Sequence, residues 1–354
     1  MRLVFREFRL LVWIYLSFGT LVWHGESLDV EVTRKTRRFS TTRPTTRSEK
    51  KLYIPRRELT PPFPDGLCGG ELITLDMNLP GNNLLLPPRP IKVWLPPGYD
   101  PQKNYPTLYC HDGQNAVSDD DSWTGRSWRL PGALTRLADH GLLESLPIVV
   151  LLSSMDGDLI PGMRRRHLEY GDANIPFARA HVDFVALTVK PLVDDQFATR
   201  PDKCFAIGAS LGGQAALHLN MRHPDKFHGA ACLSPCFTSG MLALVTAKGR
   251  ELLQSKKLYL DIGGDLGEQT VPFFDIWDHA TEKHPWNPGY FWLDTSLQPA
   301  VKSMCTILEK AQVNFAYHEI PGGRHNERAW SLRIDKPLRY LLGKEECELR
   351  SKSQ

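Results

Sequence analysis

The chain has 354 residues, of which 42% are hydrophobic and 23% are charged, with 27 glycines and 27 prolines. These values are ordinary for a globular protein, and they exclude a collagen-like, coiled-coil or wholly disordered chain. The net charge of +3 is unevenly spread, because residues 31–60 carry +7 whereas residues 61–354 carry −4. We therefore expect no binding of nucleic acid by the body of the protein.

The N-terminus has the layout of a targeting segment. Three arginines precede an apolar run from Leu10 to Trp23, which is shorter than the ~20 residues that span a bilayer, so residues 1–27 are predicted to be a signal peptide, with a signal anchor as the alternative. Residues 28–66 are basic and rich in Ser, Thr and Arg, and they are predicted to be a disordered leader. We expect a protein of the secretory pathway, without stable membrane association after leader removal. The alternative is an organelle, reached through a bipartite leader.

A catalytic domain is predicted over 67–343, followed by a tail over 344–354. From Glu71 onward short apolar strands alternate with longer amphipathic segments, which indicates an α/β protein with a mainly parallel sheet flanked by helices. The first two strands are expected to be antiparallel. Strands are predicted over 71–77, 91–95, 107–110, 148–153, 204–207, 229–233, 258–262 and 314–319, and helices over 128–139, 178–196, 211–222, 248–254, 298–311 and 327–342.

Two features interrupt this alternation. Pro191 and Pro337 are expected to kink or shorten their helices. The segment from Thr270 to Leu293 is rich in aromatic residues and proline, and it is interpreted as an irregular insertion. The chain has seven cysteines, an odd number without zinc-site spacing, so we predict no metal site and at least one unpaired thiol.

The chemistry is predicted to centre on Ser210. The strand 204–207 runs into Gly208-Ala209-Ser210-Leu211-Gly212-Gly213, and a helical pattern follows, which is the strand–turn–helix context of a nucleophilic serine. A sharp turn there exposes the hydroxyl, while the glycines allow neighbouring backbone to approach. The N–H groups of Leu211 and of Gln114, in the turn after strand 107–110, are the predicted oxyanion donors.

A serine nucleophile needs a histidine base and usually an acid, in the chain order Ser, acid, His. His325 lies in a glycine-rich loop between the last strand and the last helix, which is the expected place of the base. His111 is expected to have a structural role. Asp265 is the favoured acid because it follows strand 258–262, with Glu268 close behind and Asp261 as a third candidate.

These residues resemble the putative esterase family of α/β-hydrolases, which includes enterochelin esterase-like enzymes, feruloyl esterases and esterase D. The resemblance spans Lys92–Leu342, and its motifs are 93–99, 105–109 with 111–115, Arg166 with Glu169-Tyr170, 208–213, and 323–327 with Trp330. It implies the α/β-hydrolase fold, with Ser210 as nucleophile, His325 as base and the Gln114 and Leu211 amides as oxyanion donors. The acid stays open because its loop spacing departs from the family pattern.

The leading hypothesis is a serine esterase that cleaves a small-molecule carboxylic ester through an acyl-enzyme and needs no cofactor. One alternative is acyl transfer to a sugar or lipid acceptor. Another is a catalytically inactive binding protein, which the intact Ser210 and His325 disfavour. Trp286 and Trp292 are candidate contacts for a sugar or aryl group of the substrate, although they could instead form a satellite core.

Overall fold

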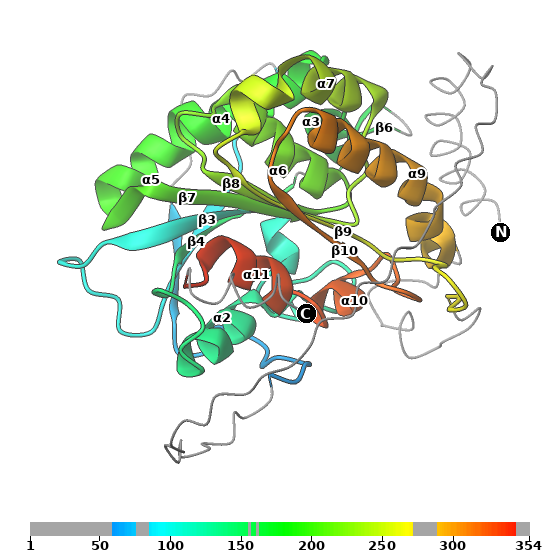
Figure 1. Ribbon diagram of the computed structural model, residues 1–354. Coiled ribbons are helices and arrows are strands. Elements are labelled where there is room, and N and C mark those ends of the chain that lie inside the picture. Colours follow the sequence, from blue (N-terminus) through cyan, green and yellow to red (C-terminus); the bar gives the residue numbers. More distant parts are fainter. Residues whose placement is uncertain (1–58, 76–84, 155–156, 161–162, 272–288, 345–354) are drawn as a thin grey trace, which may run out of the picture. The chain divides into compact units, whose positions relative to one another are not determined.

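A computed structural model describes residues 59–75, 85–154, 157–160, 163–271 and 289–344 (Figure 1). The expected signal peptide, most of the leader and Trp286 lie outside these ranges, as does all of the tail except Lys344. The described residues belong to one compact unit that begins at Leu59. None of its helices is both long and apolar enough to cross a bilayer.

An eight-stranded sheet forms the centre of this unit, in the order β1-β2-β4-β3-β7-β8-β9-β10. The strand β2 is antiparallel to both of its neighbours, and all other neighbouring pairs are parallel, which confirms the predicted antiparallel start and mainly parallel sheet. The strands are β1 (Glu71–Leu75), β2 (Ile91–Leu95), β3 (Tyr105–His111), β4 (Ile148–Leu152), β7 (Thr199–Ala209), β8 (Gly229–Leu233), β9 (Lys257–Ile262) and β10 (Phe315–Glu319).

Helices cover both faces of the sheet (Figure 1). One face carries α4 (Pro176–Phe184), α5 (Lys190–Gln196), α6 (Leu211–Arg222), α7 (Ser239–Leu253) and α9 (Gly289–Lys310), and the other carries α2 (Leu130–Asp139) and α11 (Asp335–Leu342). Shorter elements lie in the connections: β5 (Asp158–Ile160), β6 (Met163–Arg164), α3 (Arg165–Glu169), α10 (Glu327–Ser331), the 3₁₀ turn η1 (Gly113–Asn115) and the π-helical turn η2 (Val185–Val189).

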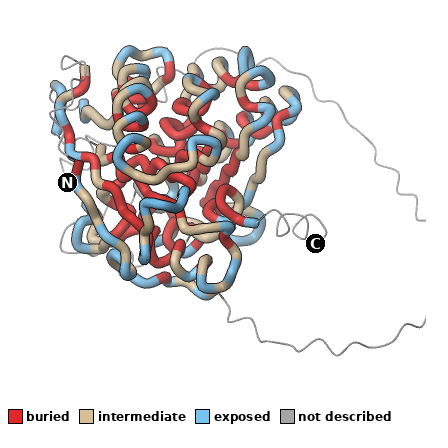
Figure 2. Tube along the Cα trace, turned by 90° about the vertical axis from the view of Figure 1, so that its left-hand side faces the viewer, coloured by how far each residue is buried: buried red, intermediate tan, exposed pale blue. Residues whose placement is uncertain are grey.

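The two faces bury two separate apolar clusters, because successive side chains of a strand point to opposite faces. In β4, Ile148, Val150 and Leu152 join the cluster under α4–α9, whereas Val149 and Leu151 join the cluster under α2 and α11. Figure 2 shows the buried segments gathered in the interior, with exposed segments around them. A strand buried on both faces has a mostly apolar sequence, which is why a strand such as β4 could be predicted from the sequence.

Several helix boundaries differ from the prediction, and prolines explain some of the differences. The helix expected over 178–196 is divided by η2 just before Pro191, where the missing N–H interrupts the regular ladder. The segment 327–342 divides into α10 and α11, and Pro337 lies in the first turn of α11, where no N–H is needed.

The other two helices are longer than predicted. The helix α7 begins at Ser239, because the Thr238 side chain caps it by accepting a hydrogen bond from Met241 N. The helix α9 begins at Gly289 and continues through Pro299, so its first part falls inside the segment interpreted as an irregular insertion.

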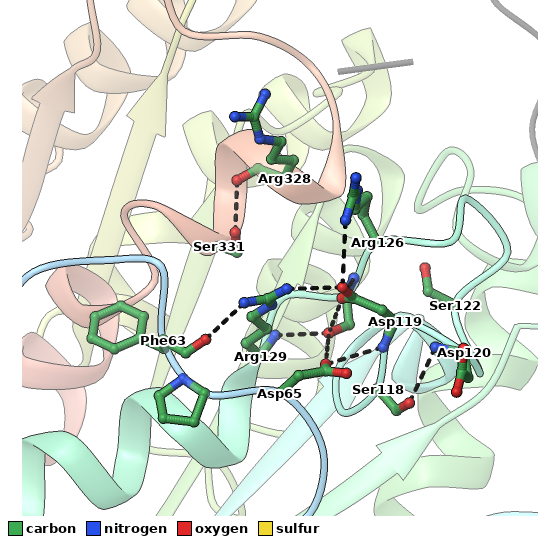
Figure 3. Close-up of polar contacts among 12 residues, drawn as sticks. Phe63, Asp65, Ser118, Asp119, Asp120, Ser122, Arg126, Arg129, Arg328 and Ser331 are labelled. Carbon is green, nitrogen blue, oxygen red and sulfur yellow. Dashed lines mark hydrogen bonds and ion pairs between the residues drawn. The ribbon is translucent and has the colours of Figure 1, made fainter. Parts of the chain in front are cut away.

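The segment 61–66 packs on the domain, so the expected leader ends earlier than residue 66. Phe63 is only 1% exposed, and its carbonyl accepts a hydrogen bond from Arg129 Nη1 at 3.0 Å. The Asp65 carboxylate accepts from Ser127 Oγ and from Asp119 N, both at 3.1 Å (Figure 3). This segment therefore anchors the loop between η1 and α2.

Cys110 and Cys204 are buried in β3 and β7, as expected for cysteines that act as small apolar residues. The six cysteines within the described ranges are free thiols.

Candidate active site

Ser210 occupies the turn between β7 and α6. Its backbone has φ 58° and ψ −127°, a conformation that non-glycine residues rarely adopt and that needs support from its surroundings. The support comes from both sides: Ser210 N donates to Leu233 O at 2.9 Å, and Cys236 N donates to Ser210 O at 3.1 Å. A Cβ at position 208 would lie 2.2 Å from Gly212 O, so only glycine permits this turn.

His325 lies in the loop after β10, as predicted, and it is buried. Its Nδ1 is 2.6 Å from Asp294 Oδ1, and both side chains are almost completely shielded from solvent. The imidazole also packs edge-on against Trp330, with ring centroids 5.1 Å apart. The ring is therefore fixed by a carboxylate on one side and an indole on another.

The carboxylate bonded to His325 belongs to none of the three predicted acids. Asp261 forms a buried ion pair with Arg333, with Arg333 Nε 3.1 Å from Asp261 Oδ2. Asp265 Oδ1 accepts a hydrogen bond from Val271 N at 2.6 Å, and Glu268 is exposed. The structure thus replaces Asp265 and Glu268 with Asp294 as the partner of the histidine.

Asp294 was missed because it lies in α9, beyond the segment interpreted as an irregular insertion. The first turns of α9 bring its carboxylate against the end of β9, where Gly263 N donates to Oδ2 at 3.0 Å. A Cβ at position 263 would lie 2.3 Å from that same oxygen. The pair Gly263-Gly264 was thus a usable signal, because two small residues after a strand leave room for a side chain from elsewhere.

The predicted oxyanion turn follows β3. Asp112 has φ 56° and ψ 42°, and Gly113 starts η1, where a Cβ would lie 2.7 Å from the Leu151 backbone. The Gln114 side chain exchanges hydrogen bonds with Ser154, with Gln114 Nε2 2.7 Å from Ser154 Oγ. A Cβ at Gly212 would lie 2.9 Å from Asp112 Oδ2, so the oxyanion turn lies directly against the start of α6.

His111 is completely buried, and its ring packs against Tyr170 and His181. Burial lowers the pKa of His111 to about 4, so the ring stays neutral near pH 7. This environment is that of a packed core side chain. His318 is exposed at the outer strand and stacks on Tyr259.

Comparison with known proteins places the chain in a family. Residues 85–341 match the family described as putative esterase. The chain belongs to the putative esterase family. A curated relative, the putative esterase NocK of Nocardia uniformis subsp. tsuyamanensis, is 46% identical over 63 residues, a match that spans 18% of this chain and 16% of that protein.

Solved structures with the same fold include esterases and siderophore hydrolases. A ferulic acid esterase aligns with a TM-score of 0.56 at 17% identity and covers 77% of this chain and 98% of its own. The siderophore hydrolase EstB from Aspergillus nidulans aligns with a TM-score of 0.53 at 18% identity, and the alignment covers 78% of this chain and 96% of EstB. The enterobactin esterase FES from Shigella flexneri aligns with a TM-score of 0.52 at 18% identity, and the alignment covers 82% of this chain and 64% of FES. These likenesses show that the chain has the α/β-hydrolase fold.

In this member of the putative esterase family, the motif residues after β6 contact the predicted oxyanion turn at Asp112. Arg166 makes two hydrogen bonds to the Asp112 carboxylate, at 2.8 and 2.7 Å, and Tyr170 Oη accepts from Asp112 N at 3.3 Å. Glu169 forms a fully buried ion pair with Arg89, with distances of 2.5 and 2.9 Å. Arg166 and Tyr170 therefore contact the predicted oxyanion turn through Asp112.

A second contact joins the oxyanion turn to the loop of His325. Glu327 Oε1 accepts from Asn115 Nδ2 at 3.3 Å and from Trp123 Nε1 at 3.0 Å. Burial raises the pKa of Glu327 to about 7. Trp123, which sequence reasoning did not single out, is 39% exposed, and Trp292 is 40% exposed two residues before Asp294.

Within the described ranges, no three His, Cys, Asp or Glu residues are grouped so that they could hold a metal ion. The predicted oxyanion turn, Ser210, Gly263 and His325 lie after the carboxyl ends of β3, β7, β9 and β10, respectively.

Proposed function

We propose that the protein hydrolyses a carboxylic ester of a small molecule through an acyl-enzyme on Ser210. His325 takes the proton from the Ser210 hydroxyl and later delivers it to the leaving alcohol, and Asp294 orients the imidazole and stabilises its cation. Water then attacks the acyl group with His325 again as base, and the carboxylic acid leaves. The N–H groups of Leu211 and Gln114 stabilise the negative oxygen of both tetrahedral intermediates.

The observation that carries this proposal is the buried 2.6 Å contact between His325 Nδ1 and Asp294 Oδ1, on a fold that holds Ser210 in a strained turn. A carboxylate on Nδ1 selects the tautomer whose Nε2 is free to accept a proton. Burying a carboxylate is costly, and the hydrogen bonds that Asp294 accepts from Ser234 Oγ and Gly263 N offset part of that cost. Family membership supports ester hydrolysis in general.

One exposed indole supports an ester with an aryl or sugar group. Trp123 is 39% exposed, and its Nε1 donates to Glu327, two residues beyond His325, whereas Trp292 is a candidate substrate contact from the sequence alone. An amphipathic indole face beside a reacting centre is suited to stacking on a planar or sugar ring. Among the structural neighbours, a ferulic acid esterase and an enterobactin esterase act on the esters that their names state.

A fluorophosphonate probe tests the mechanism directly. We expect labelling of the folded wild-type protein at Ser210, no labelling of Ser210→Ala, and hydrolysis of at least one member of a panel of aryl, sugar and short-chain esters by the wild type alone. Intact folded protein that does not label at Ser210 would refute the proposal. Product analysis with added sugar and lipid acceptors separates hydrolysis from acyl transfer.

The cellular location is also proposed from sequence. We propose that residues 1–27 direct the chain to the secretory pathway, since their arginines and short apolar run follow the signal-peptide pattern. A fluorescent fusion of residues 1–60 tests this: secretory-pathway fluorescence is expected, and accumulation in another organelle would show the alternative to be correct.

A further inference from the structure

Ser234 stands out at the end of β8, because it is a completely buried non-glycine residue with a φ of 41°. Left-handed backbone at such a residue is strained and persists where the surroundings hold it in place. The residue before it accepts the hydrogen bond from Ser210 N, and Cys236 N donates to Ser210 O. Ser234 therefore belongs to the segment that supports the nucleophile turn.

Three polar groups contact the Ser234 hydroxyl. Arg333 Nη2 lies 2.7 Å from Oγ and Trp330 Nε1 lies 3.3 Å from it, whereas Asp294 Oδ2 is 2.9 Å away. A hydroxyl has one proton and two lone pairs, and a guanidinium and an indole N–H can only donate. Both lone pairs are thus occupied by donors, so the hydroxyl proton must point to Asp294.

Arg333 is held in turn by Asp261. The guanidinium donates through Nε and Nη2 to the two Asp261 oxygens, each at 3.1 Å, and Ser234 N donates to Asp261 Oδ1 at 2.9 Å. Burial disfavours the Arg333 cation, but the Asp261 and Asp294 carboxylates outweigh that effect and raise its pKa. A permanently charged donor therefore fixes the direction of the Ser234 hydroxyl.

These hydrogen bonds fix the orientation of the Asp294 carboxylate. Its Oδ2 accepts from Ser234 Oγ and from Gly263 N, at 2.9 and 3.0 Å, so the carboxylate cannot rotate without breaking two buried hydrogen bonds. Its Oδ1 is then left for His325 Nδ1. We propose that Ser234 is a positioning residue for the acid: its hydroxyl, oriented by Arg333, holds Asp294 with Oδ1 facing His325. This inference rests on the proposed function and adds a residue that acts through Asp294.

The test compares Ser234→Ala with Ser331→Ala. Ser331 is a buried serine of α10 whose Oγ donates to Arg328 O at 2.7 Å, so its loss removes a hydrogen bond without touching Asp294 (Figure 3). We expect Ser234→Ala to lower kcat roughly tenfold with KM within about twofold, as for a lost hydrogen bond to a charged group. Ser331→Ala should keep both values.

The pH profile separates positioning from a merely structural role. Because Ser234 holds Asp294 Oδ1 against His325, its loss lets the carboxylate turn away from Nδ1 and stabilise the imidazolium less, so the acid limb of kcat/KM should move to lower pH in Ser234→Ala. Ser234→Gly should show the same kinetic defect, although glycine relieves the positive φ and should melt no lower than the alanine variant. A kcat within twofold of wild type, or an unmoved acid limb, would overturn the proposal.

A readout independent of catalysis distinguishes this failure from failure of the proposed function. The proton between His325 Nδ1 and Asp294 should give a low-field NMR resonance, as short charge-assisted hydrogen bonds do, and Asp294→Asn identifies it by its loss. The resonance should shift in Ser234→Ala and stay in place in Ser331→Ala. An unchanged resonance in Ser234→Ala refutes the positioning role, whereas wild-type protein that is not labelled at Ser210 refutes the proposed function.

Discussion

Replacing Asp294 with asparagine is expected to lower kcat/KM about a thousandfold while leaving the fold intact. The reason is the hydrogen-bond pattern around the carboxylate. Ser234 Oγ and Gly263 N both need an acceptor at the Oδ2 position, so the asparagine oxygen takes that place. Its NH₂ group then faces His325 Nδ1 and donates to it, which puts the imidazole proton on Nε2. An Nε2 that carries the proton cannot accept one from Ser210.

The size of the effect follows from the charge that is lost. An imidazolium and a carboxylate about 4 Å apart, in surroundings with an effective dielectric constant of about 20, attract each other by about 4 kcal/mol. The wild-type contact is buried on both sides, so screening by solvent is weak. Each 1.36 kcal/mol of lost transition-state stabilisation is a factor of ten in rate, which gives about a thousandfold.

The assay is steady-state hydrolysis of the best ester from the substrate panel, with Asp265→Asn as the matched control. The Asp265 carboxylate accepts a hydrogen bond from Val271 N and was the acid favoured by sequence. We expect this variant to stay within about fivefold of wild type. Thermal melting checks that both variants are folded. Asp294→Asn with more than a tenth of wild-type activity, or an equal loss in Asp265→Asn, would refute the assignment.

Two further predictions concern stability. Burial raises the pKa of Glu327 from 4.5 to about 7, so the folded state holds this proton more tightly than the unfolded chain, and the contribution of Glu327 to stability should fall by an amount on the order of 3 kcal/mol as the pH rises from 4.5 through 7. Glu327→Gln should lack this fall and be more stable than wild type at pH 8 but not at pH 4 in urea titrations; an equal difference at both pH values would contradict it. Phe63→Ala should lower the free energy of unfolding by about 3–5 kcal/mol because the ring is buried, whereas the exposed Leu67→Ala should cost below about 1 kcal/mol. A loss below 1 kcal/mol for Phe63→Ala would mean that the segment 61–66 is not part of the fold.

Local sequence was sufficient for the sheet and for Ser210. Strands buried on both faces consist mostly of apolar residues, so β2, β4, β8 and β9 were predicted to within about a residue at each end. The turn at Ser210 depends on glycines within two residues, and α6 begins at Leu211 as predicted. His325 was placed by its loop between the last strand and the last helices, which is also a local property.

The acid and the supporting residues depended on tertiary structure. Asp294 meets His325 across 31 positions of the chain, and Arg333 meets Ser234 across 99. A carboxylate in an amphipathic helix has the same local pattern whether it faces solvent or a histidine. The direction in which α9 packs on the sheet decides whether Asp294 faces solvent or His325, and apolar side chains of α9 between Leu293 and Leu308 set that direction.

The strands, the turn at Ser210 and the loop of His325 could thus be predicted from sequence alone, because each depends on residues close together in the chain. The carboxylate partner of His325, the hydrogen-bond partners of Ser234 and the packing of Phe63 were decided by the tertiary structure. These features depend on where distant segments meet, and the buried hydrogen bonds formed there fix the orientation of the polar side chains.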